Sequence, residues 1–362
     1  MWLSTDYAVC NAILRDHRRF GVRPAGDPGP TSPDTSGNTF DLGFLEREPP
    51  DHTRLRQLAA PAFRPKMMAG YAERIAEFTR DLITGIERKA ADGRPFDLIA
   101  DFAAPLPIGV ITTLMGIPDA DVHRLSEHGT VVGSALSGID SPEEAAALAT
   151  ANAELHELFS ELIALKRAHP ADDVISYLVA ATPDGITPYE LQTTARLLLI
   201  AGFETTVNLI GNGIATLLDH PDQWELLRTE PERAPAVVEE VLRFAPPVQN
   251  TSRFVHEAVS IGGAEVPAGS WIMLILAAAN RDPGVFSDPA VFDITRPRQA
   301  EHLSFASGIH YCLGAPLARL EAQIAFTELA TRLPKLQRSE DAPTWRKSRV
   351  IRGYSTLPLL VG

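Results

Sequence analysis

Hydrophobic residues recur every three to four positions along most of this chain, which is the period of amphipathic helices. Between Leu55 and Ala180, prolines and glycines interrupt the pattern and divide it into successive helices. Residues 254–276 differ, because β-branched and aromatic positions alternate there with Gly and Pro turns. The pattern predicts a mainly α-helical fold with a small β lobe. The helical part is interrupted at Pro61, Pro65, residues 93–95, residues 116–118 and Pro170.

A long helix is predicted after residue 187. Residues 187–190 read Thr-Pro-Tyr-Glu, which fits a capping box with proline in the first turn, and Pro221 marks the far end. A helix of about 33 residues would be roughly 50 Å long and would cross the whole domain. Inside it, residues 201–206 read Ala-Gly-Phe-Glu-Thr-Thr. Ala201 and Thr205 are four residues apart, so they would offer a shallow groove beside a hydroxyl on one face.

Composition narrows the function classes. The chain has 362 residues, 45% of them hydrophobic, and a formal net charge of −13, which allows one large domain over residues 1–362 and disfavours a nucleic-acid partner. Its two cysteines, Cys10 and Cys312, give no disulfide framework and favour a reducing cytosol. We interpret Cys10 as a small buried hydrophobic residue. The sequence shows neither a signal peptide nor a continuous apolar run of membrane-spanning length, so we expect a cytoplasmic monomer that does not enter a membrane.

The residues around Cys312 suit a metal-bound thiolate. Residues 305–314 read Phe-Ala-Ser-Gly-Ile-His-Tyr-Cys-Leu-Gly, and a helix is predicted from residue 315 to residue 333. The N–H groups and the positive dipole end at the start of that helix would stabilise a thiolate. Gly308 and Gly314 would let the backbone wrap closely beneath a flat ligand.

The pattern Phe-x-x-Gly-x-His-x-Cys-x-Gly in this run resembles the haem-ligand signature of the cytochrome P450 monooxygenases of the soluble bacterial type. The resemblance implies the fold of that family, with haem b between the long helix and the cysteine loop. It implies that Cys312 is the axial iron ligand, where a thiolate favours O–O cleavage. Residues 201–206 resemble the family's oxygen-activation motif, in which Glu204 is the acid and Thr205 the hydroxyl that direct protons. The implied activity is the oxidation, by O2, of a small and largely apolar intermediate of natural-product biosynthesis.

The resemblance also implies which residues hold the haem. His52 and Arg56 are four residues apart on one predicted helical face. Together with Arg253 and His310 they would compensate the haem propionates, which cannot stay unpaired in a pocket. The other residues assigned to the haem pocket are Ala201, Thr205, Phe305 and Gly314.

Glu240 stands three residues before Arg243 on a predicted helix. By itself such a pair is an ordinary surface contact worth roughly a few tenths of a kcal/mol. It resembles the buried Glu-x-x-Arg pair of the family, with Arg296 as the implied third member. Because removing one partner would strand a buried charge, we expect Glu240→Ala to prevent folding or haem uptake.

A polar stripe is predicted on the long helix, because Glu204, Asn208 and Asn212 are spaced by four residues. Two interpretations stay open at this point. The stripe lines a water path to the acid, or the asparagines are simply packed or solvated.

Partners and substrate contacts follow from the resemblance. The sequence has no flavin or nicotinamide fingerprint, so electrons must come from outside, and an acidic ferredoxin with its reductase is the implied donor. It would dock on a basic patch on the Cys312 side, formed by Arg56, Arg64, Lys66 and Arg319. A substrate bound to a carrier protein is an alternative partner. The expected substrate contacts are Leu198, Ala201, Val248, Asn250 and Tyr354.

Two other functions are weighed against a monooxygenase. A peroxide-driven or rearranging haem enzyme would often lack the acid and threonine, and a non-catalytic module that recruits carrier proteins would lose the cysteine or that pair. The chain keeps all three residues. The start of the chain departs from the family, because residues 2–7 resemble a strand that other members reach only after several tens of residues. An N-terminal helix and strand of the family are therefore expected to be absent.

Overall fold

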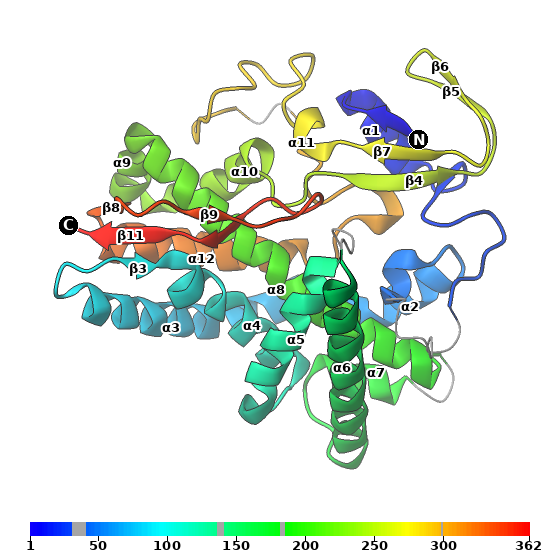
Figure 1. Cartoon of the computed structure of the whole chain (residues 1–362), viewed down its shortest axis with the longest axis horizontal. Helices are drawn as coiled ribbons and strands as arrows, with labels where there is room; N and C mark the ends of the chain where they lie inside the picture. Colours follow the sequence, from blue (N-terminus) through cyan, green and yellow to red (C-terminus); the bar gives the residue numbers. More distant parts are fainter. Residues whose placement is uncertain (31–40, 136–140, 182–184, 298–299) are drawn as a thin grey trace.

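The computed structural model describes residues 1–30, 41–135, 141–181, 185–297 and 300–362. A large helical part lies beside a smaller β-rich part, as the hydrophobic pattern predicts (Figure 1). The helices are α1 (Tyr7–Arg15), α2 (Asp51–Ala59), α3 (Pro65–Ala90), α4 (Pro105–Met115), α5 (Val122–Ala135), α6 (Pro142–Ala168), α7 (Val174–Ala180), α8 (Pro188–Asp219), α9 (Pro221–Thr229), α10 (Ala234–Phe244), α11 (Leu276–Ala279) and α12 (Ala315–Arg332). The strands are β1 (Trp2–Ser4), β2 (Phe20–Gly21), β3 (Phe96–Asp97), β4 (Thr251–Val255), β5 (Val259–Ile261), β6 (Ala264–Val266), β7 (Trp271–Leu274), β8 (Leu336–Arg338), β9 (Thr344–Trp345), β10 (Tyr354–Thr356) and β11 (Pro358–Val361).

The predicted long helix is α8, and its capping box is formed. The Glu190 N–H donates to Thr187 Oγ1 at 3.2 Å, and the Thr187 N–H donates to Glu190 Oε2 at 2.8 Å. These bonds satisfy backbone donors that have no partner within the helix. α8 runs through the middle of the helical part and contacts α4, α5, α6, α10 and α12. The main hydrophobic core therefore forms around it.

α8 is apolar on average although Arg196 and Glu204 interrupt its apolar run. Among the described residues it is the one helix long and apolar enough, by length and composition, to cross a bilayer. Within its most apolar stretch, 83% of the residues are buried inside the protein. Its hydrophobic character thus comes from its place at the centre of the core.

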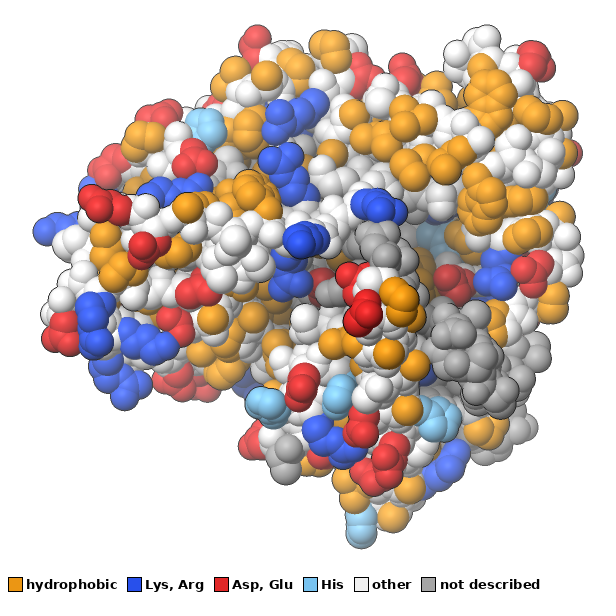
Figure 2. Space-filling model, in the orientation of Figure 1, with side chains coloured by type: hydrophobic (Ala, Val, Ile, Leu, Met, Phe, Trp, Pro, Cys, Tyr) orange, Lys and Arg blue, Asp and Glu red, His pale blue; other side chains and the backbone are white. Residues whose placement is uncertain are grey.

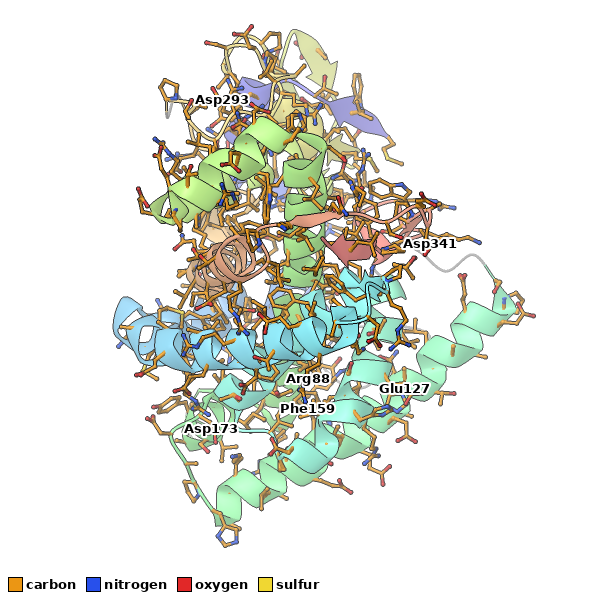
Figure 3. The ribbon with its side chains drawn as sticks, turned by 90° about the vertical axis from the view of Figure 1, so that its left-hand side faces the viewer. Arg88, Glu127, Phe159, Asp173, Asp293 and Asp341 are labelled. Carbon is orange, nitrogen blue, oxygen red and sulfur yellow. The ribbon has the colours of Figure 1, made fainter. Side chains whose placement is uncertain are left out.

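The outer helices form layers around α8. Figure 3 shows the molecule turned by 90°, with α5 and α6 on one side of α3 and the β lobe on the other. Asp173, at the start of α7, and Asp293 lie toward opposite ends of this view. Phe159 on α6 is fully buried, so the inner side of this long outer helix is part of the core.

The β lobe has its own small core. Its main sheet has the order β1-β7-β4-β2, with β1 parallel to β7 and the other neighbours antiparallel. The strand expected over residues 2–7 ends at Ser4, because the Asp6 carboxylate accepts the Val9 N–H at 2.8 Å and starts α1. Cys10 is fully buried between α1 and this sheet, which confirms its assignment as a core residue.

The C-terminal strands return to the central helix. β11 pairs with both β3 and β8 in a three-stranded antiparallel sheet, and β9 pairs with β10 as a hairpin. Both β8 and β10 contact α8. Residues 344–356 are therefore brought against the middle of a helix that lies far away in sequence.

Candidate functional site

The Cys312 loop has a tight backbone path. The short helical turn Gly308–His310 precedes it, and the Cys312 N–H donates to the Phe305 carbonyl at 2.9 Å. Gly308 has φ of 72°, and a Cβ there would lie 2.3 Å from the Leu14 carbonyl oxygen, so only glycine fits. A Cβ at Gly314 would meet nothing within 4 Å. The expected need for glycine is therefore confirmed at Gly308 only: Gly314 has φ of −81° and open space around it, so the backbone there does not require glycine.

Competing influences act on the Cys312 thiol. Burial raises its pKa, while the Gly314 N–H and the positive charges of Arg56 and Arg319 act in the opposite direction. α12 begins at Ala315, so its N-terminal N–H groups also lie beside the sulfur. These N–H groups and positive charges would stabilise the negative charge of a thiolate once a metal replaces the proton.

Arg319 is fixed by several contacts beside the loop. Its guanidinium lies 4.5 Å from the Phe305 ring centroid and 2.6 Å from Glu239. Burial alone would raise the pKa of Glu239, but His302 and Arg319 bring it down to about 2. Phe305 thus packs under a guanidinium whose charge is already paired, and Arg319 is less available for a docking partner than the sequence suggested.

His52 and His310 lie together. Their ring centroids are 4.3 Å apart, and both side chains are buried. Three of their ring nitrogens have no hydrogen-bond partner among the described residues: both nitrogens of His52, and Nε2 of His310. Burial and the nearby cations lower the pKa of His52 to about 4 and that of His310 to about 2. Both imidazoles are therefore neutral at pH 7 and have unused hydrogen-bonding capacity.

Two arginines complete this group. Arg56 donates to the Tyr311 carbonyl at 2.6 Å, which connects α2 to the cysteine loop. Arg253 is 4% exposed, and it donates to Ser252 O and Thr251 Oγ1 but forms no ion pair with a described residue. Burial lowers its pKa to about 10, and its positive charge in turn lowers the pKa of His310.

A cluster of this kind favours an anionic ligand. Burying Arg253 with no ion-pair partner among the described residues is costly, since only the charge of Glu48, beyond ion-pair distance, opposes the effect of burial, and the two histidines have unsatisfied nitrogens. Carboxylates placed between these groups would remove both costs. The residues therefore fit a pair of carboxylates such as the two propionates of haem b, and Cys312 lies on the adjoining loop.

α8 is exposed at only one stretch of its middle. All residues of 191–200 and 206–217 are buried, whereas Ala201 is exposed and Thr205 partly exposed. Thr205 Oγ1 donates to the Ala201 carbonyl at 3.1 Å, which fixes the hydroxyl on this side of the helix. Thr206 Oγ1 is bound the same way to Gly202 O but is buried. The predicted pair Ala201 and Thr205 thus shares an open face, where a flat ligand can lie against the helix.

Glu204 faces a different direction and is buried. Its Oε1 lies 3.2 Å from Arg346 Nη1, and its Oε2 has no partner among the described residues. Burial raises the pKa of Glu204 to about 7, and Arg346 opposes that rise. Sequence reasoning missed Arg346, since nothing in the segment around it predicts a contact with a residue 142 positions away.

Glu240, Arg243 and Arg296 are brought together as expected. Glu240 accepts two bonds from Arg243, at 2.7 and 2.8 Å, and one from Arg296 at 3.2 Å. It also accepts the Asp293 N–H at 3.0 Å, and Arg243 donates further to three backbone carbonyls. Glu240 and Arg243 are both at most 5% exposed. The cluster joins α10 to the loop at 289–296.

The expected substrate contacts are not gathered in one place. Leu198 is buried one turn before Ala201, while Val248 forms a bridge to Ile351 and Asn250 donates to the Arg349 carbonyl. The Tyr354 ring stacks on Trp345 at 4.0 Å and lies under Arg338. Arg338 pairs with Asp219, the last residue of α8, so the Tyr354 side chain faces the end of α8 that is remote from Ala201. The structure thus places Leu198 and Ala201 together and Tyr354 elsewhere.

Comparisons with known proteins give one consistent result. The family profile described as Cytochrome P450 matches residues 142–336. Cytochrome P450 107B1 of Saccharopolyspora erythraea is 44% identical over 90% of the chain and 79% of its own length. Vitamin D(3) 25-hydroxylase of Pseudonocardia autotrophica is 41% identical over 100% of the chain and 88% of its own length. The solved structure of P450BioI with an acyl carrier protein bearing hexadec-9Z-enoic acid matches with a TM-score of 0.90 and 37% identity, over 100% of this chain and 92% of that one.

Proposed function

The chain belongs to the cytochrome P450 family, and from this membership we propose that Cys312 supplies the thiolate ligand of its haem b and that Glu204 and Thr205 direct protons. Its activity is that of a bacterial P450 monooxygenase, in line with relatives named as hydroxylases and oxygenases. One observation carries the assignment of the site. A thiol at a helix start adjoins a group of donors, buried except for the half-buried Arg56, that forms no ion pair with a described residue: His52, Arg56, Arg253 and His310.

Each part of the site has its own task. When bound, the haem takes up electrons and O2 and supplies the oxidising chemistry, while the protein binds, orients and controls protons. Burial raises the pKa of the Cys312 thiol, and the Gly314 N–H and the charge of Arg56 oppose that rise and would stabilise the thiolate in the bound complex. His52 and Arg253 would hold the propionates and so orient the cofactor beside the cysteine loop. Phe305, packed under Arg319, keeps water from the sulfur.

Proton control falls to neighbouring residues on α8. The Thr205 hydroxyl is anchored on the Ala201 carbonyl, and its oxygen can still accept a hydrogen bond on the exposed side of the helix. Glu204, with a pKa of about 7, can take a proton from solvent and release it again at neutral pH. The two residues thus combine a proton reservoir with a hydroxyl that faces the ligand.

The test of this function is isotopic. With a ferredoxin system, NADH and 18O2, the product should carry one labelled oxygen atom per turnover. Product formed with hydrogen peroxide but not with O2 would instead indicate a peroxide-driven enzyme. Substrate binding without product under either condition would indicate a recruitment module.

For the substrate, we propose a small and largely apolar natural-product intermediate. Leu198 and Ala201 give the open stretch of α8 an apolar wall. Named relatives include 6-deoxyerythronolide B hydroxylase of Saccharopolyspora erythraea, and a structural neighbour, CYP267B1, is described in complex with myristic acid. Spectral titrations should compare a macrolactone, a sterol, a fatty acid and the same fatty acid on an acyl carrier protein. Tightening by about tenfold or more on the carrier would assign a carrier-bound substrate.

We also propose a cytoplasmic enzyme that receives electrons from an acidic ferredoxin. Of the expected docking residues, Arg64 is exposed, whereas Arg56 is bound to Tyr311 and Arg319 to Glu239. The side chain of Lys66 lies outside the described residues. Arg64→Glu should slow haem reduction by the ferredoxin at low ionic strength and leave dithionite reduction unchanged. Equal ferredoxin rates in both proteins would place the docking surface elsewhere.

A further inference from the structure

The Glu204 carboxylate is enclosed from two sides. On one side lies α5, where a Cβ at Gly133 would fall 1.6 Å from Glu204 Oε2, so a larger residue there would displace the carboxylate. On the other side lies the Arg346 guanidinium, 3.2 Å from Oε1. Among the described residues, Arg346 is the one charged group whose field acts on Glu204. The position of this carboxylate is therefore set by one helix and one arginine.

Arg346 is itself held by the C-terminal hairpin. Its N–H donates to the Gly353 carbonyl at 2.9 Å, and its Nε donates to the Tyr354 carbonyl at 3.4 Å. The stacking of Trp345 on Tyr354 at 4.0 Å stiffens the same hairpin. The guanidinium is thus a fixed charge that the β9–β10 hairpin presents to α8.

The ion pair has an inner and an outer member. The Glu204 side chain is 5% exposed and that of Arg346 is 21% exposed. Lys347, Arg349 and Arg352 of the same segment are exposed, and Figure 2 shows Lys and Arg side chains in a row across this face, near the end of the hairpin. Arg346 therefore connects the buried Glu204 carboxylate to an exposed, basic part of the surface.

Unpaired acceptors continue inward from Glu204. Asn208 Nδ2 donates to the Glu204 carbonyl at 2.8 Å, but Asn208 Oδ1 has no partner among the described residues. The same is true of Asn212 Oδ1 and of Glu204 Oε2, and all three residues are buried. Buried acceptors in a row are ordinarily satisfied by water. Asn212 Nδ2 donates to the Ala245 and Arg352 carbonyls, and a Cβ at Gly353 would fall 1.7 Å from Asn208 Oδ1, so the asparagines are also closely packed and both interpretations of the stripe stay open.

We propose that Arg346 is a positioning residue for Glu204: it holds Oε1 at the hairpin while Oε2 lies against Gly133 of α5, and so fixes the carboxyl, one residue from Thr205, where it exchanges protons with water. The inference rests on the proposed role of Glu204 in proton delivery. In the cycle, protonated Glu204 gives its proton to a water that leads to Thr205, and the resulting carboxylate regains one from solvent beside Arg346. Arg346 keeps its own proton throughout, because its guanidinium stays charged in proteins.

The decisive experiment is a pH titration of Glu204 in the resting, haem-loaded enzyme. The carboxyl stretching band is followed by infrared difference spectroscopy and assigned by its loss in Glu204→Gln. In Arg346→Gln the midpoint should rise by about one pH unit or more, because the opposite charge that favours the carboxylate is gone. Arg346→Lys keeps the charge and should give a midpoint between those of the wild type and Arg346→Gln. If the Gln variant folds poorly, the midpoint of Arg346→Lys is compared with that of the wild type alone, and it should be the higher of the two. During turnover, Arg346→Gln should divert more NADH into peroxide.

Arg338→Gln is the matched control. Arg338 also ties a C-terminal strand to α8, through Asp219 and the Ala215 carbonyl, but at the far end of the helix from Glu204. Its removal should leave the Glu204 midpoint unchanged. An unchanged midpoint in Arg346→Gln, or an equal rise in Arg338→Gln, would overturn the proposal. Failure of the proposed function is seen separately, as a wild-type enzyme whose carbon monoxide spectrum lacks the thiolate signature, since the resting titration needs no turnover.

Discussion

The imidazole rings of His52 and His310 lie 4.3 Å apart, centroid to centroid, although one belongs to α2 and the other to the turn before Cys312. Both rings are buried, and their free nitrogens have no described partner. Two elements distant in sequence thus bring unsatisfied hydrogen-bonding groups to one place beside the loop that carries Cys312. A carboxylate-bearing cofactor is the group that would satisfy them.

Removing either ring should therefore weaken haem retention. Each of His52→Ala and His310→Ala loses a hydrogen bond to a charged group, worth about 1.5–3 kcal/mol. We expect haem transfer to apomyoglobin to become about 10 to 100 times faster. His123→Ala, at an exposed position of α5, is the control and should leave the transfer rate unchanged. Equal rates in all four proteins would remove these histidines from the cofactor site.

Two glutamates allow a buried ion pair to be compared with a surface ion pair of the same sequence spacing. Glu240→Ala would strand Arg243 and Arg296 and should cost about 3–5 kcal/mol of unfolding free energy, with loss of haem content. Glu225→Ala breaks the Glu225–Arg228 pair, which has the same three-residue spacing on the protein surface. Urea unfolding should barely distinguish that variant from the wild type. Full haem content and unchanged stability in Glu240→Ala would contradict a structural role.

The pKa of Glu204 predicts a pH dependence of stability. Burial raises this pKa to about 7 in the folded protein, above its usual value in an unfolded chain. The raised pKa means that protonation favours the folded state at low pH, and that this contribution is lost as the pH rises through 7. Glu204→Gln should therefore gain stability relative to wild type between pH 5 and pH 8, by up to about 3 kcal/mol. Urea unfolding at both pH values measures the difference, and a constant difference would rule out a raised pKa.

Thr205 and Thr206 provide a matched pair of adjacent hydroxyls. Both bond back to carbonyls four residues earlier, but Thr205 is partly exposed and Thr206 is buried. Thr205→Ala should lower the product formed per NADH by about tenfold or more, while Thr205→Ser retains coupling because it keeps the hydroxyl. Thr206→Ala should stay coupled. Similar losses in the two alanine variants would indicate a general effect on helix packing.

Local chemistry explains why some features could be predicted from the sequence. The ends of α8 carry their own signals in the 187–190 capping box and Pro221, so its bounds follow from residues that lie in contact along the chain. The Cys312 loop is equally local, since Gly308 and the start of α12 flank it directly. Glu240 and Arg243 are one turn apart, and only their burial required the tertiary structure.

Other features depend on packing between distant segments. Arg346 reaches Glu204 because the C-terminal hairpin lies against α8, and no periodicity near residue 346 indicates that contact. Tyr354 was expected near the substrate, but its ring stacks on Trp345 and lies beside Arg338. Adjacent residues of a strand point to opposite sides, so the side that a hairpin residue faces depends on the strand pairing. The membrane-like composition of α8 reflects its central position, because a helix buried on all sides needs apolar residues all round.

The central claim is that Cys312 binds the haem iron as a thiolate, and the carbon monoxide difference spectrum of the reduced protein tests it most directly. The wild type and Cys10→Ser, which alters the buried cysteine of the β lobe, should both show the strongly red-shifted Soret band of thiolate ligation. Cys312→Ser should lose that band. A wild-type spectrum without the red shift, or a Cys312→Ser spectrum that keeps it, would contradict the account.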